Sequence, residues 1–225
     1  MDCLIIAAGF GSRLRAVSPS KPLTPVAGVP LIERVIRAAA AGGATRFVVV
    51  TGHEADGLEA FLETLPFAIV PARVADWSLP NGHSVLAGAA RMPGDYLLTM
   101  SDHLFDPDIV AALIAAPSAA LRLAVDRDLA NPLLDMDDVT KVETGADGAI
   151  VRIGKTLTSF DAADTGLFRA TPALAEAVAA GGGSLSDGVQ RLADQGQAKT
   201  LDVTGRFWLD VDDPAALAKA EARLG

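Results

Sequence analysis

Hydrophobic runs alternate with amphipathic stretches through the first half of the chain. The runs are mostly apolar, which is typical of strands buried on both faces of a sheet; they cover residues 2–8, 46–52, 67–72 and 95–102. The stretches between them carry apolar residues at helical spacing; they cover residues 30–43, 54–65 and 81–92. This alternation predicts a mainly parallel sheet with helices on both of its faces.

The pattern changes in the second half. Residues 140–155 alternate around a turn at Gly145–Gly148, which predicts an antiparallel hairpin. Beyond it we expect a strand at 164–171, helices near 172–180 and 185–195 separated by a stop at 181–184, strand segments within 198–212, and a closing helix at 213–224. The predicted fold class is α/β, Rossmann-like and doubly wound, with a mainly parallel sheet. The antiparallel insertion in the second half is expected to form a lid or wall beside the ligand crevice.

Composition narrows the class of protein. The 225 residues are 50% hydrophobic and no linker interrupts them, so we expect one domain. A formal net charge of −9 argues against binding to nucleic acid or to an anionic membrane. Cys3 is the only cysteine, which excludes an intramolecular disulfide and favours a packed core thiol. With neither a secretion signal nor a membrane-spanning run, the expected location is cytoplasmic.

The loop after the first strand carries the strongest chemical signal. No P-loop string occurs in the chain, and the glycines of this loop lack the third glycine of a dinucleotide fingerprint. A simple turn would explain Gly9 and Gly11, but not Arg13 and Lys21 near the carboxyl end of a strand. Glycines let backbone N–H groups approach an oxyanion, while a guanidinium and an ammonium neutralise a polyphosphate.

This string resembles the signature of sugar-nucleotide pyrophosphorylases and related nucleotidyltransferases, roughly A-A-G-x-G-[ST]-R-L followed by P-K-P-L. Ser20 stands where the family usually has proline, so the loop before Lys21 is expected to be less rigid. The resemblance implies the nucleotide-diphospho-sugar transferase type of fold. It also implies that Arg13 and Lys21 are catalytic.

Aspartates at the ends of two later strands are candidate ligands for Mg²⁺, which prefers one or two carboxylates. Asp102 follows one apolar run, and Asp210 and Asp212 would share a face of another strand by the period of two. Alternatively, Asp102 caps a helix or turn and Asp212 or Asp213 caps the last helix; we assign the cap to Asp213. The "SDH" and "WLD" strings resemble the metal-binding aspartates of the same family.

The histidines give no catalytic signal of their own. His53, His83 and His103 show no metal-ligand spacing, so we interpret them as loop residues or neighbours of a site. A phosphomonoester acceptor needs no histidine base, because its second pKa of about 6 leaves it largely ionised at neutral pH.

Segments spread over nearly the whole chain point to one member of this group of enzymes. They are similar, in matching order, to the cytidylyltransferase domain that makes CDP-inositol from CTP and inositol-1-phosphate; they include "SDHLFDPDIV", "LAVDRD", "DMDDVTKV", "VRIGKTL", "DTGLF" and "DVTGRFWLDVDDP". In that family the domain is often fused to a membrane-bound CDP-alcohol phosphotransferase, which we expect here to be a separate chain. A homodimer is a further expectation.

The resemblance also assigns residues to two halves of the domain, a nucleotide-binding half at about 1–115 and an acceptor-binding half at about 116–225. The nucleotide would be bound by Ala7, Ala8, Gly9, Gly11, Lys21, Asn81, Gly82 and Ser84. The acceptor would be bound by Lys141, Lys155, Asp164 and Thr165. Without a function in binding, both lysines would be ordinary solvated side chains, and Asp164 and Thr165 would cap a turn.

Three other functions stay open from the residues alone. The acceptor could be phosphocholine or an aminophosphonate, it could be a sugar-1-phosphate, or the chain could be a regulatory module that binds a nucleotide without chemistry. Phosphocholine is disfavoured, because a quaternary ammonium is held by an aromatic cage. The only Trp and Tyr residues are Trp77, Tyr96 and Trp208, whereas the second half supplies cations, namely Arg122, Arg127, Lys141, Arg152 and Lys155.

Overall fold

A nine-stranded sheet runs through the structure, a computed structural model that describes residues 1–225. Its first half consists of four parallel strands in the order β6 (Tyr96–Met100), β1 (Asp2–Ile6), β4 (Arg46–Thr51) and β5 (Ile69–Arg73). Their carboxyl ends therefore lie along one edge, where open α/β sheets bind ligands. The predicted α/β class with a mostly parallel central sheet is confirmed.

The second half of the sheet is built around β11 (Ala162–Ala170), which runs antiparallel to β6. The other strands there are β8 (Leu121–Asp126), β9 (Lys141–Thr144), β10 (Ile150–Gly154) and β12 (Ala198–Asp202). One edge of β11 pairs with β8, and the other pairs first with β9 and then with β6. The sheet therefore forks along β11, and residues near Gly166 border the opening between the two branches.

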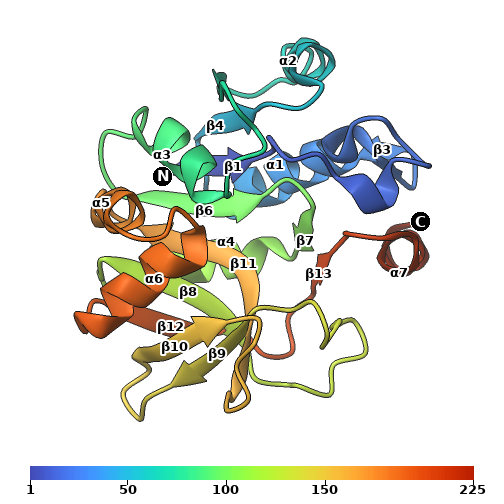
Figure 1. Ribbon diagram of the computed structural model, residues 1–225. Helices are drawn as coiled ribbons and strands as arrows, with labels where there is room; N and C mark the ends of the chain where they lie inside the picture. Colours follow the sequence, from blue (N-terminus) through green and yellow to red (C-terminus); the bar gives the residue numbers. More distant parts are fainter.

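Helices cover both faces of the sheet (Figure 1). One face carries α1 (Leu31–Ala41), α2 (Ala55–Leu62), α4 (Pro107–Ala115) and α7 (Pro214–Leu224). The opposite face carries α3 (Gly82–Ala89), α5 (Ala173–Ala180) and α6 (Leu185–Asp194). Two small sheets complete the fold, one of β7 (His103–Phe105) with β13 (Trp208–Asp210) and one of β2 (Pro25–Val26) with β3 (Val29–Pro30).

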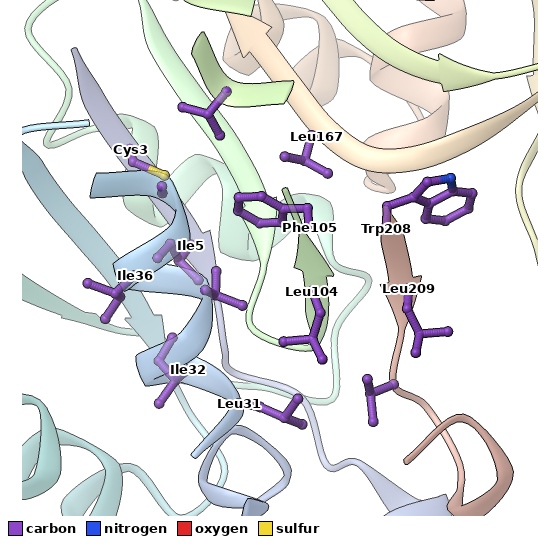
Figure 2. Packing of buried hydrophobic residues seen from close by; sticks show 14 of the residues in the cluster. Cys3, Ile5, Leu31, Ile32, Ile36, Leu104, Phe105, Leu167, Trp208 and Leu209 are labelled. Atoms are coloured by element: carbon purple, nitrogen blue, oxygen red, sulfur yellow. The ribbon is translucent and has the colours of Figure 1, made fainter. Parts of the chain in front are cut away.

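Alternating side chains of β1 separate two hydrophobic cores. Cys3 and Ile5 point into the core under α1, while Leu4 points into the core under α3. Figure 2 shows how residues of β1, α1, β7 and β13 gather in the first of these cores. Each fully buried Leu or Ile stabilises the fold by about 1.5–3 kcal/mol relative to its exposed state. These cores hold the strand ends, and hence the loops after them, in fixed positions.

Most sequence-predicted elements are present with shorter bounds. The predicted hairpin forms, with the Gly148 N–H donating to the Gly145 carbonyl in its turn, and the stop at 181–184 separates α5 from α6. The sequence patterns did not predict α4, β7 or β8. No helix is long and apolar enough to cross a membrane.

One sequence argument is wrong. Asp210 and Asp212 do not share a strand face, because β13 pairs with β7 only over three residues and ends at Asp210. The chain then turns into α7, whose first turn is capped by Asp213. Asp212 therefore lies in the connection, where its carboxylate is free to turn toward the loop after β1.

Candidate active site

The loop after β1 crosses over Lys21 at a glycine. Gly11 has a positive φ of 61°, and a Cβ on it would collide with the Lys21 side chain. Glycine is therefore required here for both the backbone conformation and the close approach. A Cβ on Gly9 would meet no atom within 4 Å, so open space lies beside its backbone. The hydroxyl of Ser18 donates to the Ser20 carbonyl at 2.8 Å and braces the segment before Lys21.

Charged side chains of alternating sign form one continuous chain across the cleft. The Lys21 ammonium donates to both Asp102 and Asp212. The guanidinium of Arg13 donates to Asp212 at 2.6 Å and to Asp138 at 2.8 Å. Lys155 binds the other oxygen of Asp138, and His103 Nδ1 lies 2.8 Å from Asp102. We call this set the charge chain; in order it is Lys155, Asp138, Arg13, Asp212, Lys21, Asp102 and His103.

The charge chain keeps its buried members ionised. Burial by itself would lower the pKa of Lys21, but Asp102 and Asp212 outweigh it and hold that pKa above its ordinary value. Burial would likewise raise the pKa of Asp102, yet Lys21 and His103 hold it far below the usual range. The lysine is therefore a fixed cation and the aspartate a fixed anion at neutral pH.

A group of potential metal ligands lies at the end of the charge chain. Ligand atoms of Asp102, His103 and Asp210 lie within 4.8 Å of one another. Oδ1 of Asp210 is buried and has no hydrogen-bond partner. Burial raises the Asp210 pKa well above its ordinary value, and the neighbouring Asp102 adds to the effect. A carboxyl group that is buried with an oxygen lacking a donor, and whose ionised form is disfavoured, is the arrangement that a cation would relieve.

His103 is held against β11 by a second glycine. Gly166 has a φ of 75°, and a Cβ on it would collide with the His103 ring. Burial would lower the His103 pKa, but Asp210 and Asp102 outweigh it and raise that pKa to about 9. The histidine therefore acts as a cation between two carboxylates in this structure.

Two adjoining cavities border the charge chain. The smaller, of about 290 Å³, lies against the glycine loop and Lys21. The larger, of about 550 Å³, lies between the 133–140 loop, β11 and the start of α7. Four residues line both, namely Arg13, Asn81, Met100 and Asp212. A ligand in one cavity would therefore share contacts with a ligand in the other.

Most residues assigned to the nucleotide surround the smaller cavity. Its lining includes Ala7, Gly9, Gly11, Arg13, Lys21, Asn81, Asp102 and Asp212. Ala8, Gly82 and Ser84 are buried and do not line it. Gly82 packs against the Gly183 backbone, and the side-chain oxygen of Asn81 accepts the Leu185 N–H at 2.9 Å. Their assigned contacts with a base or ribose stay predictions.

The residues assigned to the acceptor divide into two pairs. Lys155 and Asp164 line the larger cavity. Burial raises the Asp164 pKa to about 6, and one of its oxygens accepts the Gly166 N–H at 2.7 Å. Lys141 and Thr165 line neither cavity: Lys141 donates to the Lys155 carbonyl at 2.9 Å, and the Thr165 hydroxyl donates to the Ala124 carbonyl at 2.8 Å. The structure thus brings two of the four to the cleft.

Sequence reasoning left the role of one member of the charge chain open and missed another. The interpretation of the histidines as loop residues or neighbours of a site fits His103, whose Nδ1 lies beside Asp102, but the sequence did not separate it from His53 and His83. Asp138 lies in an acidic run with Asp135 and Asp137, and nothing local distinguishes it from them. The assignment of Asp213 as a helix cap is confirmed, since its carboxylate accepts the Ala216 N–H at 2.7 Å.

Comparisons with known proteins identify a family and a fold. The sequence profile described as "MobA-like NTP transferase domain" matches residues 3–141. A "Bifunctional IPC transferase and DIPP synthase" from Rubrobacter xylanophilus is 34% identical over 224 residues, covering 96% of this chain and 50% of that protein. A protein of the same name from Aquifex aeolicus is 30% identical over 230 residues, covering 98% of this chain and 51% of that protein.

The fold of this chain also matches a solved structure. The inositol-1-phosphate CTP transferase from T. maritima aligns with a TM-score of 0.87 and 23% identity, covering 100% of this chain and 97% of that one. The chain spans about half the length of the curated relatives named above.

Proposed function

The chain belongs to the MobA-like NTP transferase family, and from that premise we propose that it transfers a cytidylyl group from CTP to inositol-1-phosphate. The products are CDP-inositol and pyrophosphate. The observation that carries this proposal is the continuity of the charge chain, which runs from the glycine-loop cavity into the larger cavity. A transferase needs such a continuous cleft because both substrates must meet at one phosphorus atom.

The comparisons support this choice of substrates. The full-length structural match carries inositol-1-phosphate and CTP in its name. The curated relatives are named for two activities, and this chain aligns with about half of each protein. We assign the nucleotide-transferring activity to this half, because the aligned segment covers nearly the whole chain, which carries the glycine loop and the group of Asp102, His103 and Asp210.

The carboxylate cluster fits Mg²⁺. The unpartnered oxygen of Asp210 and the carboxylate of Asp102 are hard oxygen donors, which Mg²⁺ prefers. His103 would orient Asp102 rather than bind the ion, because its Nδ1 is already turned to that carboxylate. Asp212 is a further candidate ligand, because it shares Lys21 with Asp102. A bound Mg²⁺ supplies charge neutralisation for the phosphates of the nucleotide.

The residues of the smaller cavity would bind and polarise the triphosphate. Open backbone at Gly9 offers N–H groups to phosphate oxygens. Lys21 has one ammonium proton beyond those given to Asp102 and Asp212, and Arg13 has donors beyond the one nitrogen that binds Asp138 and Asp212. These remaining donors would bind the phosphate oxygens and stabilise negative charge as it develops. An oxygen of the acceptor phosphate forms a bond to the α-phosphorus, the bond from that phosphorus to the β-bridging oxygen breaks, and the electron pair leaves with pyrophosphate.

The larger cavity favours a polyol phosphate over phosphocholine. Its lining contains one aromatic side chain, Trp208, whose Nε1 donates to Asp126 at 3.0 Å. One aromatic ring is not the cage that a quaternary ammonium requires. The free oxygen of Asp164 can accept a bond from a ring hydroxyl, and Lys155 can meet the phosphate.

The test is pyrophosphate release from CTP with Mg²⁺ and a panel of acceptors. The panel contains inositol-1-phosphate, phosphocholine, 2-aminoethylphosphonate and glucose-1-phosphate. We expect inositol-1-phosphate to be turned over fastest. Turnover of phosphocholine at least tenfold faster would overturn the choice of acceptor but leave cytidylyl transfer intact. If the folded protein released no pyrophosphate from CTP with any of these acceptors, cytidylyl transfer would be rejected. The chain would then be interpreted as a regulatory module that binds a nucleotide without chemistry.

Asp102→Ala is the matched control for this assay. It removes one of the two carboxylates proposed to hold Mg²⁺, so turnover should fall on the order of 10³-fold. Circular dichroism should show the wild-type fold. Near-normal turnover by this variant would mean that the observed activity does not use this site.

A further inference from the structure

Asp138 uses both of its oxygens to bind cations from the two halves of the molecule. Its Oδ2 accepts from Arg13 in the glycine loop at 2.8 Å, and its Oδ1 accepts from Lys155 after the hairpin. The side chain lines the larger cavity, as do those of both cations. A carboxylate therefore stands where a guanidinium and an ammonium converge beside the space for the acceptor.

Two converging cations that bind two oxygens of one anion form a binding site that a phosphate group also fits. Resting on the proposed function, we propose that Asp138 occupies the subsite of the acceptor's phosphate and competes with it for Arg13 and Lys155. Asp138 is thus an internal competitor. It must leave the two cations before a phosphomonoester can take its place.

The contacts of Asp138 are weak enough to be displaced. The side chains of Arg13 and Lys155 are 49% and 56% exposed, and that of Asp138 is 30% exposed. Exposed ion pairs contribute little net free energy. A phosphomonoester dianion brings more charge than a carboxylate, so it can replace Asp138 without unfolding the loop. Hydrogen bonds from Lys155 and Arg13 lower the Asp138 pKa to about 2, so it remains an anion at neutral pH.

The loop that carries Asp138 is anchored away from the two cations. Asn131 donates to the buried carboxylate of Asp126 at 3.0 Å, and the Leu133 N–H bonds the Asn131 side chain at 3.0 Å. Residues 135–139 follow this anchor and form a turn in which the Val139 N–H donates to the Asp135 carbonyl at 2.8 Å. Displacement of the Asp138 side chain therefore leaves the base of the loop in place.

The test measures phosphate affinity without nucleotide. Inositol-1-phosphate and inorganic phosphate are titrated by calorimetry into wild-type protein, Asp138→Asn and Asp137→Asn. Asparagine keeps the shape of the side chain and removes the competing charge. We expect Asp138→Asn to bind both probes about tenfold more tightly than wild type.

Asp137→Asn is the matched control, because Asp137 is exposed on the same loop and forms no ion pair. It removes the same charge from the same region, so its affinity should stay within about twofold of wild type. An equal gain in both variants would overturn the proposal in favour of general repulsion. Unchanged or weaker binding by Asp138→Asn would overturn it too, and would make Asp138 a residue that positions Arg13 and Lys155.

Failure of the proposed function gives a different result. If wild-type protein released no pyrophosphate with inositol-1-phosphate while Asp138→Asn alone bound inorganic phosphate more tightly, the subsite would be supported and the acceptor assignment lost. If the wild type turned over inositol-1-phosphate and Asp138→Asn showed no gain in affinity, the acceptor would be supported and the internal competitor lost.

Discussion

At the scale of single residues, Lys21 is the cation on which the proposed chemistry depends most. Its ammonium is buried between Asp102 and Asp212, so it is held in one place before any substrate binds. We expect Lys21→Ala to lower kcat on the order of 10²-fold or more, because preorganised charge acts mainly on the transition state. The KM for CTP should rise much less. Steady-state kinetics with varied CTP measures both constants.

The matched control for this variant is Lys199→Ala. Lys199 is a lysine of β12 that pairs with Asp147 at 2.6 Å and lines neither cavity. Its kinetics should equal those of the wild type. If Lys21→Ala weakened CTP binding with kcat unchanged, Lys21 would serve ground-state binding only.

The grouping of Gly11, Arg13 and Lys21 around one cavity could be predicted from the sequence, since they belong to one local string. The place of Asp138 in the charge chain could not be predicted, because it depends on a contact with Arg13, which lies 125 residues away in the sequence. His103 is an intermediate case. Its neighbour Asp102 marked the site, but Gly166, which the ring packs against, lies on a distant strand.

At the scale of elements, the start of α7 depends on the cap at Asp213. The carboxylate satisfies the Ala216 N–H, which has no partner within the helix. We expect Asp213→Ala to cost about 1 kcal/mol of unfolding free energy, which lowers Tm by about 2–4 °C in a protein of this size. Thermal melting followed by circular dichroism measures the shift.

Asp213→Asn separates the cap from the charge. Both substitutions remove the same charge, but an asparagine oxygen can still accept the Ala216 N–H. We therefore expect Asp213→Asn to melt close to the wild-type temperature. Equal losses in the two variants would show that charge, and not the capping bond, stabilises this turn.

Elements with contrast between polar and apolar faces could be predicted, and those without it could not. The predicted helix at 30–43 has a buried face and a polar face, and it corresponds to α1. The segment of α4 is apolar over most of its surface, so its periodicity gives little contrast. The end of β13 was predicted wrongly for a different reason: its length is set by pairing with β7, which no local pattern encodes.

At the scale of the whole molecule, β11 decides how the two halves are joined. It pairs with β6 of the parallel half and with β8 and β9 of the other, and the two branches separate near Gly166. The sequence predicted a parallel sheet with an antiparallel insertion. It could not predict this fork, because strand order depends on pairings between distant segments. The larger cavity lies beside the fork, so the site follows from the long-range topology.

The shared sheet also predicts that the protein unfolds as one unit. The two cores lie on opposite faces of the sheet, and each contains residues from both halves of the chain. Separating the halves would therefore break the pairing of β11 with β6 and open both cores.

We expect one thermal transition by calorimetry, with an enthalpy of roughly 160 kcal/mol from about 0.7 kcal/mol per residue. The van't Hoff enthalpy should equal it. Far-ultraviolet circular dichroism and tryptophan fluorescence, to which the buried Trp208 contributes, should follow the same curve. Two separated transitions, or a van't Hoff enthalpy near half the calorimetric value, would mean that the halves fold independently and that the charge chain joins two domains.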